Sequence, residues 1–596
     1  MIKLSDYVMN FIAEQGVKDI FLLSGGGCMH LIDSVGNCEK LNYICNLNEQ
    51  AVGIAIEAYG QYTNNLGVGL VTTGPGSTNA ITGIAAAYVD STPCLMLSGQ
   101  VKRSDFAKPY GVRQMGYQEV DIVSIVNPIT KFAVTVVEPE KIRYYLQKAI
   151  FLATHGKKGP VWIDIPLDVQ AAMIDETNLE EFSVEKEVEN NVSINVGEKV
   201  KCALELLNKA KRPCILVGNG IRLSDAEELF LDLVKKLNIP VLATWKAIDF
   251  FDENDHLFFG RPGAIGQRGS NFIQQNCDYL LIIGARLDFG QTGYNHRNFA
   301  PKAQKVMVDI DKAEIDKMDM SIEVKADVDA KIFVEEALKQ ISLVENIDRN
   351  DWFNYCNKMK SKYPVILKEY LEQKEYVNSY AFIDKLSELL NESDLIVPGS
   401  SGSCSEVTMQ GFKVKKGQRL FNNEGFGAMG FGLPASIGAC IASNGKRTIC
   451  INGDGGFQLN IQELETVRRL NLPIKFFIIN NDGYGAITNS QRNHFNGFYV
   501  ASEKNSGMTL ADICKVATGY EIKNMRINSN SELKEKIKEA LEYEGPVVCD
   551  VMVHPDQPTA PKLMSEKLPD GNMISKPLED LWPFLDREEF EENMLK

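Results

Sequence analysis

The sequence feature that most limits the fold is the repeated alternation of short apolar runs with longer amphipathic segments. Runs such as GVGLVTT, GPVWIDIP, DYLLIIGA, RTICING and IKFFIIN have the length of a strand, and Gly, Ser or Asn follows many of them. Strands that are buried on both faces read as continuous apolar runs, and the helices between them cover a parallel sheet. The pattern therefore predicts an α/β protein built from parallel sheets.

The length of 596 residues is too great for a single hydrophobic core. Composition divides the chain into three α/β blocks, a linker, a crossover and a tail. The acidic, Asn-rich stretch 166–200 reads as a linker, and 336–376 reads as a charged helical crossover. The expected blocks are 1–170, 195–335 and 376–555, and a Pro- and acid-rich tail covers 556–596.

Charge and composition exclude several classes of partner. The formal net charge of −16 argues against nucleic acid and membrane surfaces, which are anionic. No apolar run approaches the roughly 20 residues of a membrane span, and Asp6 and Glu14 lie in an amphipathic N-terminal pattern that is unlike a signal peptide. The 13 cysteines show no C-x-x-C spacing, which favours a reducing, cytoplasmic location.

Polar residues stand at the ends of two neighbouring apolar runs. Asp454 follows RTICING, the segment 458–471 has the pattern of one amphipathic helix, and IKFFIINN ends at Asn481. In a right-handed βαβ unit both strands end at the same edge of the sheet, where α/β proteins bind ligands. One carboxylate, one amide oxygen and a backbone carbonyl make half of a Mg²⁺ site that phosphate and water complete. The alternative is that GDGG and NNDG are simple turns.

The GDG…NN pair resembles the diphosphate–Mg²⁺ motif of thiamin diphosphate enzymes. Over nearly the whole chain, the order of motifs is similar to that of acetohydroxyacid (acetolactate) synthases and their relatives. The resemblance implies three doubly wound parallel-sheet domains that bind, in order, the pyrimidine, often FAD, and the diphosphate, with the tail as a lid. It implies that Asp454, Asn481 and the carbonyl of Gly483 hold Mg²⁺.

Further motifs match the family's cofactor-binding segments. Gly74 and Gly76 open a helix beside the pyrimidine, VPGSSGSCSE matches the diphosphate loop, and Met429 matches the apolar wedge that bends the cofactor. Ser403 and Cys404 stand where the family often has Gln-His. The cofactor-binding residues that the resemblance implies are Gly74, Gly76, Gly399, Ser401, Gly402, Ser403, Cys404, Ala428, Met429, Gly453, Gly455, Gly456, Asn481, Tyr484, Gly485, Ala486 and Ile487.

Glu49 matches the catalytic glutamate of the family, since it stands between a strand-like run and a helical pattern. A carboxylic acid beside N1′ of the aminopyrimidine favours the tautomer whose exocyclic nitrogen removes the C2 proton. The alternative is a glutamate that stabilises a helix N-terminus. Gly26, or its neighbour Gly27, matches a Gly-rich loop that could donate to an oxyanion, and Gln118 matches a substrate-pocket glutamine.

Two further residues match site positions but have ordinary structural alternatives. His30 stands where relatives usually have proline, and a histidine at a helix start commonly serves in capping or packing. Lys131 matches a pocket-rim lysine that could attract a carboxylate, but a surface lysine beside a strand needs no such role. The sequence leaves both alternatives open.

Two departures from the family bear on substrate and flavin. Ser490 stands where acetohydroxyacid synthases carry a tryptophan that shapes the acceptor pocket, one helical turn after Ala486. The GxRFDDR motif appears as GARLDFG (284–290), so that the last arginine is Gly290. FAD could still bind through Gly218, Gly220, Arg286 and Asp309.

The leading hypothesis is a carboligase that decarboxylates pyruvate and transfers the acetyl unit to a second carbonyl. That acceptor is pyruvate or a larger ketone such as a ketosugar, because the tail resembles those of relatives found with bacterial surface-sugar genes. One alternative is an FAD-dependent oxidoreductase of the pyruvate oxidase kind, and another is a cofactor-binding homologue without catalysis. The family also implies a homodimer or homotetramer in which the cofactor bridges two subunits.

Overall fold

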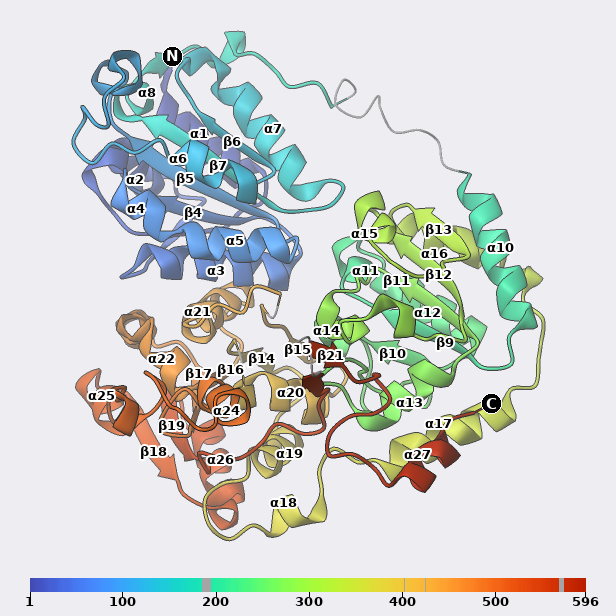
Figure 1. Ribbon diagram of the computed structural model, residues 1–596. Helices are drawn as coiled ribbons and strands as arrows, with labels where there is room; N and C mark the ends of the chain where they lie inside the picture. Colours follow the sequence, from blue (N-terminus) through green and yellow to red (C-terminus); the bar gives the residue numbers. More distant parts are fainter. Residues whose placement is uncertain (185–194, 401, 424, 568–572, 596) are drawn as a thin grey trace.

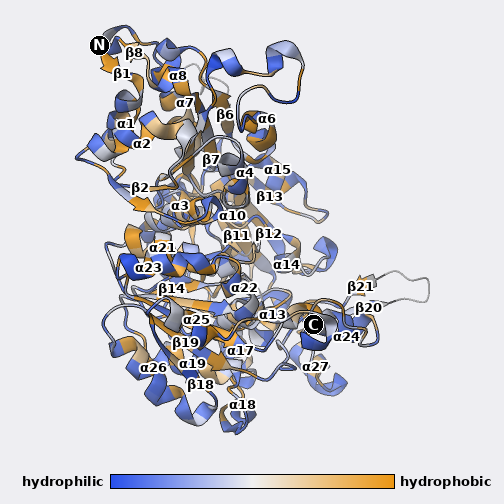
Figure 2. Cartoon of the chain, turned by 90° about the vertical axis from the view of Figure 1, so that its left-hand side faces the viewer, coloured by the Kyte–Doolittle hydropathy of each residue, from blue (hydrophilic) through white to orange (hydrophobic). Residues whose placement is uncertain are grey.

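Three parallel β-sheets flanked by helices form the body of the protein (Figure 1). The computed structural model describes residues 1–184, 195–400, 402–423, 425–567 and 573–595. The apolar runs of the sequence are the buried strands of these sheets, and Figure 2 shows them as hydrophobic segments within more hydrophilic helices. The predicted α/β class with parallel sheets is therefore confirmed.

The first sheet has six strands, and all neighbours in it are parallel. In spatial order they are β3 (Asn42–Cys45), β2 (Asp19–Leu22), β4 (Gly67–Val71), β5 (Cys94–Gln100), β7 (Pro160–Pro166) and β6 (Phe132–Thr135). Its main helices are α1 (Leu4–Glu14), α2 (Met29–Asn37), α3 (Glu49–Thr63), α4 (Pro75–Asn79), α5 (Ile81–Val89), α6 (Ile122–Val126) and α7 (Ile142–Thr154).

The last sheet repeats the topology of the first. Its order is β15 (Arg419–Leu420), β14 (Leu395–Pro398), β16 (Thr448–Gly453), β17 (Ile474–Asn480), β19 (Val547–Met552) and β18 (Lys523–Ile527). In both sheets the spatial order is second, first, third, fourth, sixth and fifth strand along the chain. The main helices here are α19 (Ser379–Leu389), α20 (Glu406–Gly411), α21 (Gly432–Ala442), α24 (Gly485–His494), α25 (Ile513–Gly519) and α26 (Leu533–Glu542).

The central sheet has five parallel strands and lies beside the other two domains (Figure 1). Its order is β10 (Val241–Ala243), β9 (Pro213–Val217), β11 (Tyr279–Ile283), β12 (Gln304–Asp309) and β13 (Val324–Asp327). Its main helices are α10 (Val196–Lys209), α11 (Gly220–Leu223), α12 (Glu227–Leu237), α13 (Arg268–Asn276), α14 (Phe289–Thr292), α15 (Lys312–Asp316) and α16 (Ala330–Lys339), and α17 (Asn350–Lys362) and α18 (Lys368–Glu372) lead to the last domain.

Helices α3 and α21 pack against each other and join the first domain to the last (Figure 2). A Cβ atom at Gly438 would lie 2.1 Å from the carbonyl oxygen of Ala55. The two backbones therefore approach so closely that only glycine fits at this position. Because α3 begins at Glu49, this contact places the start of that helix against the last domain.

Two sequence expectations are corrected. The linker predicted for 166–200 is too long, because α8 (Leu167–Gln170) and β8 (Met173–Ile174) belong to the first domain, where β8 pairs antiparallel with β1 (Ile2–Lys3). Residues 185–194 of that stretch lie outside the described residues. The single helix predicted for 458–471 is instead divided into α22 (Asp454–Gln458), the 3₁₀ turn η11 (Ile461–Glu463) and α23 (Leu464–Arg469). The break falls at Asn460, whose φ is −135°.

The tail returns to the central domain. It contains the strands β20 (Ser565–Lys567) and β21 (Met573–Ser575) and the helix α27 (Arg587–Asn593). Asn271 donates to the carbonyl of Leu578 at 2.6 Å, and Arg268 donates to the carbonyl of Leu581 at 3.0 Å. The tail therefore fastens the last domain to α13 of the central one. Within the described ranges, no helix is both long and apolar enough to cross a membrane.

Candidate active site

Asp454 lies at the edge where β16 and β17 end side by side. Parallel pairing aligns Gly453 with Ile479, which brings the two loops together. The Asp454 side chain is buried, and its Oδ2 atom accepts from the backbone N–H groups of Asn481 and Gly483 at 3.1 and 3.2 Å. Burial raises the pKa of this carboxyl to about 7. A cation here would offset that desolvation and hold the group ionised.

Asn481 carries an unsatisfied oxygen at the same edge. Its Oδ1 atom is buried and has no hydrogen-bond partner in the part of the chain that the structure describes. A buried acceptor without a partner is costly, and a bound cation would satisfy it. Among the described residues, no group of three or more His, Cys, Asp or Glu side chains could hold a metal. One carboxylate plus one amide oxygen nevertheless fits Mg²⁺, which needs few protein ligands beside phosphate and water.

Two glycines, Gly455 and Gly485, allow the loops at this edge of the sheet to approach each other closely. A Cβ atom at Gly455 would lie 2.4 Å from the ring of Tyr484 and 3.5 Å from the terminal methyl of Met429. A Cβ atom at Gly485 would lie 2.2 Å from the Asn481 amide nitrogen. The fold therefore gathers Met429, Tyr484 and the Asp454 loop, as the resemblance implies for the cofactor's binding site.

The predicted diphosphate loop lies against the same strand ends. A Cβ atom at Gly399 would lie 2.4 Å from Oδ1 of Asn452 and 3.3 Å from the Cys404 sulfur. Gly402 has φ of +61° with open space beside its Cα, a conformation that favours glycine. Sequence reasoning missed Asn452, which is buried beside Gly399. The sequence signal for Asn452 is its place as a polar residue near the end of the otherwise apolar strand β16.

The other predicted cofactor residues differ in exposure. Ser401 lies outside the described residues. Ala486 and Ile487 are exposed on α24, whereas Ser403, Ala428, Gly453 and Gly456 are partly buried. All of the described ones belong to the last domain.

Glu49 lies with a second group of predicted residues in the first domain. It begins α3, and its carboxylate accepts from the side chain of Asn79 at 3.0 Å. A Cβ atom at Gly76 would lie 3.3 Å from this carboxylate. Gly74 has φ of +62°, and a Cβ atom there would lie 2.0 Å from the carbonyl oxygen of Gln118. Glu49 and Gln118 thus lie beside α4, which follows Gly74 and contains Gly76, and Asn79 is a partner that sequence reasoning missed.

The Gly-rich loop before α2 separates its two candidate donors. The N–H of Gly27 donates to Oγ1 of Thr72 at 3.1 Å, whereas the Cα of Gly26 faces open space. Because the N–H of Gly27 is already bonded to Thr72, Gly26 stays the candidate donor of the two. His30 is partly buried in the first turn of α2. Lys131 donates to the carbonyls of Leu152 and His155 at the C-terminal end of α7, where a cation complements the helix dipole.

The two groups remain separate within one chain. Across the described part of the chain, no hydrogen bond or ion pair joins Glu49 to Asp454, Asn481 or Gly483. Glu49 lies on the first domain and Asp454 on the last. The first domain therefore carries the predicted catalytic residue Glu49, and the last domain carries the predicted metal ligands.

A cavity of about 590 Å³ lies where the three domains meet. Its lining includes four residues predicted for FAD, Gly218, Gly220, Arg286 and Asp309. A Cβ atom at Gly218 would lie 2.3 Å from the carbonyl oxygen of Gly284, so this turn allows no side chain. Burial raises the pKa of Asp309, at the end of β12, to about 6.

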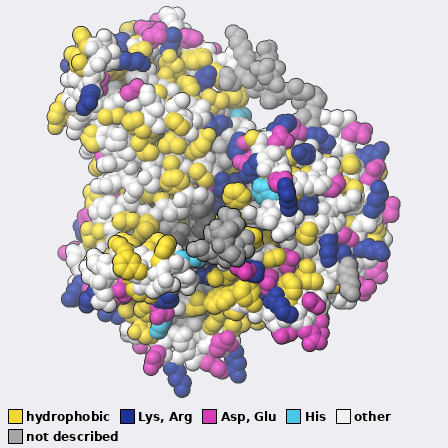
Figure 3. Space-filling model, in the orientation of Figure 1, with side chains coloured by type: hydrophobic (Ala, Val, Ile, Leu, Met, Phe, Trp, Pro, Cys, Tyr) yellow, Lys and Arg dark blue, Asp and Glu magenta, His cyan; other side chains and the backbone are white. Residues whose placement is uncertain are grey.

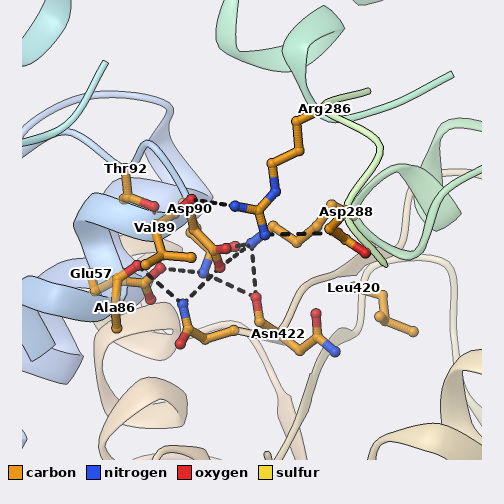
Figure 4. A network of polar contacts seen from close by, with 12 residues as sticks. Glu57, Ala86, Val89, Asp90, Thr92, Arg286, Asp288, Leu420 and Asn422 are labelled. Atoms are coloured by element: carbon orange, nitrogen blue, oxygen red, sulfur yellow. Dashed lines mark hydrogen bonds and ion pairs between the residues drawn. The ribbon is translucent and has the colours of Figure 1, made fainter. Parts of the chain in front are cut away.

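Polar groups from the three domains converge in one network (Figure 4), of which Asp90, Lys246 and Arg286 line this cavity. The Lys246 ammonium donates to the side chains of Gln61 and Asp90 and to the carbonyl of Asn422, at 2.5, 3.0 and 2.8 Å. Arg286 donates to the carbonyl of Val89 at 3.3 Å. The backbone at Asn422, in the segment before Met429, is thus bonded to the Lys246 ammonium, which lines the cavity.

Three family models match successive parts of the chain. Residues 2–125 match "Thiamine pyrophosphate enzyme, N-terminal TPP binding domain", residues 200–339 match the "central domain" and residues 400–551 match the "C-terminal TPP binding domain". Thiamine pyrophosphate is thiamin diphosphate. The fold and the site thus define a thiamin diphosphate enzyme of three α/β domains.

Curated relatives of this chain include acetolactate synthase large subunits. The chain is 32% identical over 558 residues to the acetolactate synthase large subunit of Cyanidium caldarium, with 92% of each chain covered. It is 32% identical to a probable acetolactate synthase large subunit of Methanocaldococcus jannaschii, again with 92% of each covered, and 30% identical to that of Lactococcus lactis, with 94% covered. The chain belongs to the acetolactate synthase-like family of thiamin diphosphate-dependent enzymes.

Proposed function

We propose that this enzyme decarboxylates pyruvate and transfers the acetyl unit to a carbonyl acceptor bulkier than 2-ketobutyrate. The observation that carries the carboligase assignment is the Asp454–Asn481 edge, whose buried carboxylate and unsatisfied amide oxygen suit a metal–diphosphate group. The relatives named acetolactate synthase support pyruvate as the donor. Retention of Glu49 at the start of α3, together with these proposed metal ligands, argues against a binding protein without catalysis.

The residues of the last domain would hold the cofactor. Asp454, Asn481 and the carbonyl of Gly483 are the proposed Mg²⁺ ligands, and Mg²⁺ would neutralise the diphosphate charge. Met429 and Tyr484 meet at Gly455 and are the proposed walls of the thiazolium site. When bound, thiamin diphosphate supplies a carbon nucleophile and an electron sink.

The residues of the first domain would move protons and orient the substrate. Glu49 would hold its proton against the aminopyrimidine, an acid–base role that its position at the start of α3 allows. The N–H of Gly26 would donate to the oxygen where negative charge develops. Gln118 would orient the substrate from a backbone with φ of +63°, a strained conformation for a residue of this type.

The proposal of a wide acceptor pocket depends on Ser490, which stands where the family has a tryptophan. This residue is exposed on α24, a helix without a buried residue. Tyr499, an aromatic side chain that could fill the space of a missing indole, is held by a 3.3 Å hydrogen bond from Arg492. The neighbouring Asn489 accepts from Arg492 at 3.1 Å. The hydroxyl of Ser490 and the amide of Asn489 suit a polar acceptor, such as a ketosugar, better than an apolar indole wall would.

Replacing Ser490 by tryptophan is expected to shift acceptor choice toward 2-ketobutyrate and away from ketosugars. An indole adds an apolar wall, and one methylene in an apolar pocket is worth about 1–3 kcal/mol, which corresponds to roughly 10- to 200-fold in selectivity. Competition between pyruvate, 2-ketobutyrate and a panel of ketosugars measures the shift. Glu535→Trp, on the exposed surface of α26, is the matched control. A wild-type enzyme that ignores every larger ketone would refute the wide pocket.

FAD is the proposed occupant of the cavity between the domains. A volume of about 590 Å³ is within the range of cofactor sites. The turn at Gly218 and Gly220 allows close approach. The lining carries both signs of charge, and its basic side chains, Arg286, Lys157, Lys158 and Lys246, are the ones that suit a diphosphate. The same cavity is the observation that favours an FAD-dependent oxidase as the second candidate function.

The proposed active enzyme is a homodimer or a larger assembly of this chain. Figure 3 shows a region with few charged side chains where the first and last domains meet, whereas the central domain carries many. Large apolar side chains are exposed in both of these domains, among them Tyr43, Leu47, Met429 and Leu459. A second copy would bring the Glu49 half of one chain to the Asp454 half of the other.

Coexpression of two inactive variants tests this arrangement. If sites form between chains, Glu49→Gln and Asp454→Ala subunits combine into heterodimers with one intact site. Random pairing in a twofold dimer then restores about a quarter of the wild-type activity. Separately purified variants, mixed without exchange of subunits, serve as the control. Coexpressed heterodimers that are inactive would contradict a site shared between chains, as would an active monomer in sedimentation.

A further inference from the structure

Glu463 is a buried carboxylate of the last domain that reaches the loop preceding Glu49. Its Oε1 atom accepts from the backbone N–H groups of Leu47 and Asn48 at 2.8 and 3.1 Å. Its Oε2 atom accepts from the side chains of Asn46 and Thr466 at 2.9 and 2.8 Å. The side chain is fully buried, so both oxygens rely on these four donors.

Asn460 makes the matching contact on the other side of Glu49. Its amide nitrogen donates to the side-chain oxygen of Gln50 at 3.0 Å and to the carbonyl of Gly430 at 2.9 Å. Gly430 follows Met429, the residue proposed to support the cofactor. One short segment of the last domain therefore holds the residues before and after Glu49.

The interrupted helix accounts for this geometry. A continuous helix through 458–471 would satisfy its own backbone, but the chain leaves helical geometry at Asn460 and starts again as η11 and α23. Asn460 and Glu463 both direct their side chains to the first domain. Burial of the carboxyl raises the pKa of Glu463, which shows that its site is desolvated. Both the irregular backbone and the buried acid are costly features, and three of the four donors that satisfy Glu463 belong to the first domain.

We propose that Glu463, assisted by Asn460, is a positioning residue that fixes the start of α3 and thereby aims the Glu49 carboxylate. The loop before α3 would otherwise expose the N–H groups of Leu47 and Asn48 without partners. Asn48 caps the helix by accepting from the N–H of Gln50 at 2.8 Å, so the orientation of Glu49 depends on where Asn48 is held. This inference rests on the proposed role of Glu49.

Glu463→Gln tests the proposal with little change in shape. An amide has one acceptor oxygen in place of two, so it cannot accept from all four donors at once, and the groups around it must reorient. C2 proton exchange of bound thiamin diphosphate and kcat are expected to fall together by on the order of 10-fold or more, because small misplacements of a catalytic group are costly. Thiamin diphosphate affinity in calorimetry is expected to stay at the wild-type value. Glu465→Gln, a partly exposed neighbour that pairs with Arg468, is the matched control.

A double variant separates positioning from general damage. If Glu463 acts through Glu49, the Glu49→Gln and Glu463→Gln effects are not additive, and the double variant is no slower than Glu49→Gln alone. If Glu463→Gln does not fold, Asn460→Ala provides a second test of the proposal, with a smaller expected loss of C2 proton exchange.

Several outcomes would overturn the inference. Wild-type exchange in Glu463→Gln, additive losses in the double variant, or a parallel loss of cofactor affinity would each show that Glu463 is only structural. Wild-type exchange in Glu49→Gln would instead overturn the proposed role of Glu49 itself, so the two failures are distinguishable.

Discussion

Replacing Glu49 by glutamine is expected to slow C2 proton exchange and turnover by on the order of 10² or more, a typical acid–base contribution. Glutamine keeps the size of the side chain and can still accept from Asn79, so the local structure should survive. It cannot hold a proton against the aminopyrimidine as a carboxylic acid does. The exchange rate, followed by NMR on the cofactor-loaded enzyme, isolates this step from acceptor chemistry.

Calorimetry should show that Glu49→Gln binds thiamin diphosphate with nearly wild-type affinity, because the diphosphate and metal ligands lie in the last domain. Glu39→Gln, an exposed glutamate in the same domain, is the matched control and should leave exchange unchanged. If Glu49→Gln exchanges and turns over like the wild type, Glu49 is merely a helix-start glutamate.

Removal of the Asp454 carboxylate is expected to abolish Mg²⁺-dependent binding of thiamin diphosphate. Asp454 is the only carboxylate among the three proposed ligands, and its loss leaves the diphosphate charge without a neutralising metal. Asn481→Ala should have the same effect, since it removes the unsatisfied oxygen. Calorimetry with and without Mg²⁺ measures both, and chelation of the metal from wild type should reproduce the variants.

Asp482→Asn is the matched control for the metal ligands. Asp482 is an exposed neighbour with φ of +57°, a conformation that asparagine tolerates. This variant should keep wild-type affinity for the cofactor. Unchanged affinity in Asp454→Ala would place the metal elsewhere and would remove the main support for the site.

The strands and the sheet edge could be predicted because they depend on local pattern. IKFFIIN is buried over nearly its whole length, and this is the property that its apolar run records. Parallel pairing of β16 and β17 then places Asp454 beside Asn481, as the βαβ rule requires. Family motifs supplied the rest of the residues around these loops.

Other features depend on contacts that a local pattern does not encode. The 458–471 segment has helical periodicity, yet Asn460 and Glu463 interrupt it to bind residues more than 400 positions away in the sequence. The approach of Gln118 to Gly74 needs a positive φ at both residues, and glutamine gives no hint of it. The charged groups around Lys246 come together only because three domains meet there.

Product analysis with isotopically labelled pyruvate tests the central claim most directly. The enzyme, supplied with thiamin diphosphate, Mg²⁺ and either pyruvate alone or a ketosugar acceptor, is followed by NMR for carbon products and by absorbance for any bound flavin. A carboligase releases CO₂ and forms a new carbon–carbon bond between the labelled acetyl unit and the acceptor, while flavin absorbance stays constant. Free acetate or acetyl phosphate formed as the flavin bleaches, or no CO₂ at all, would contradict the proposed carboligase.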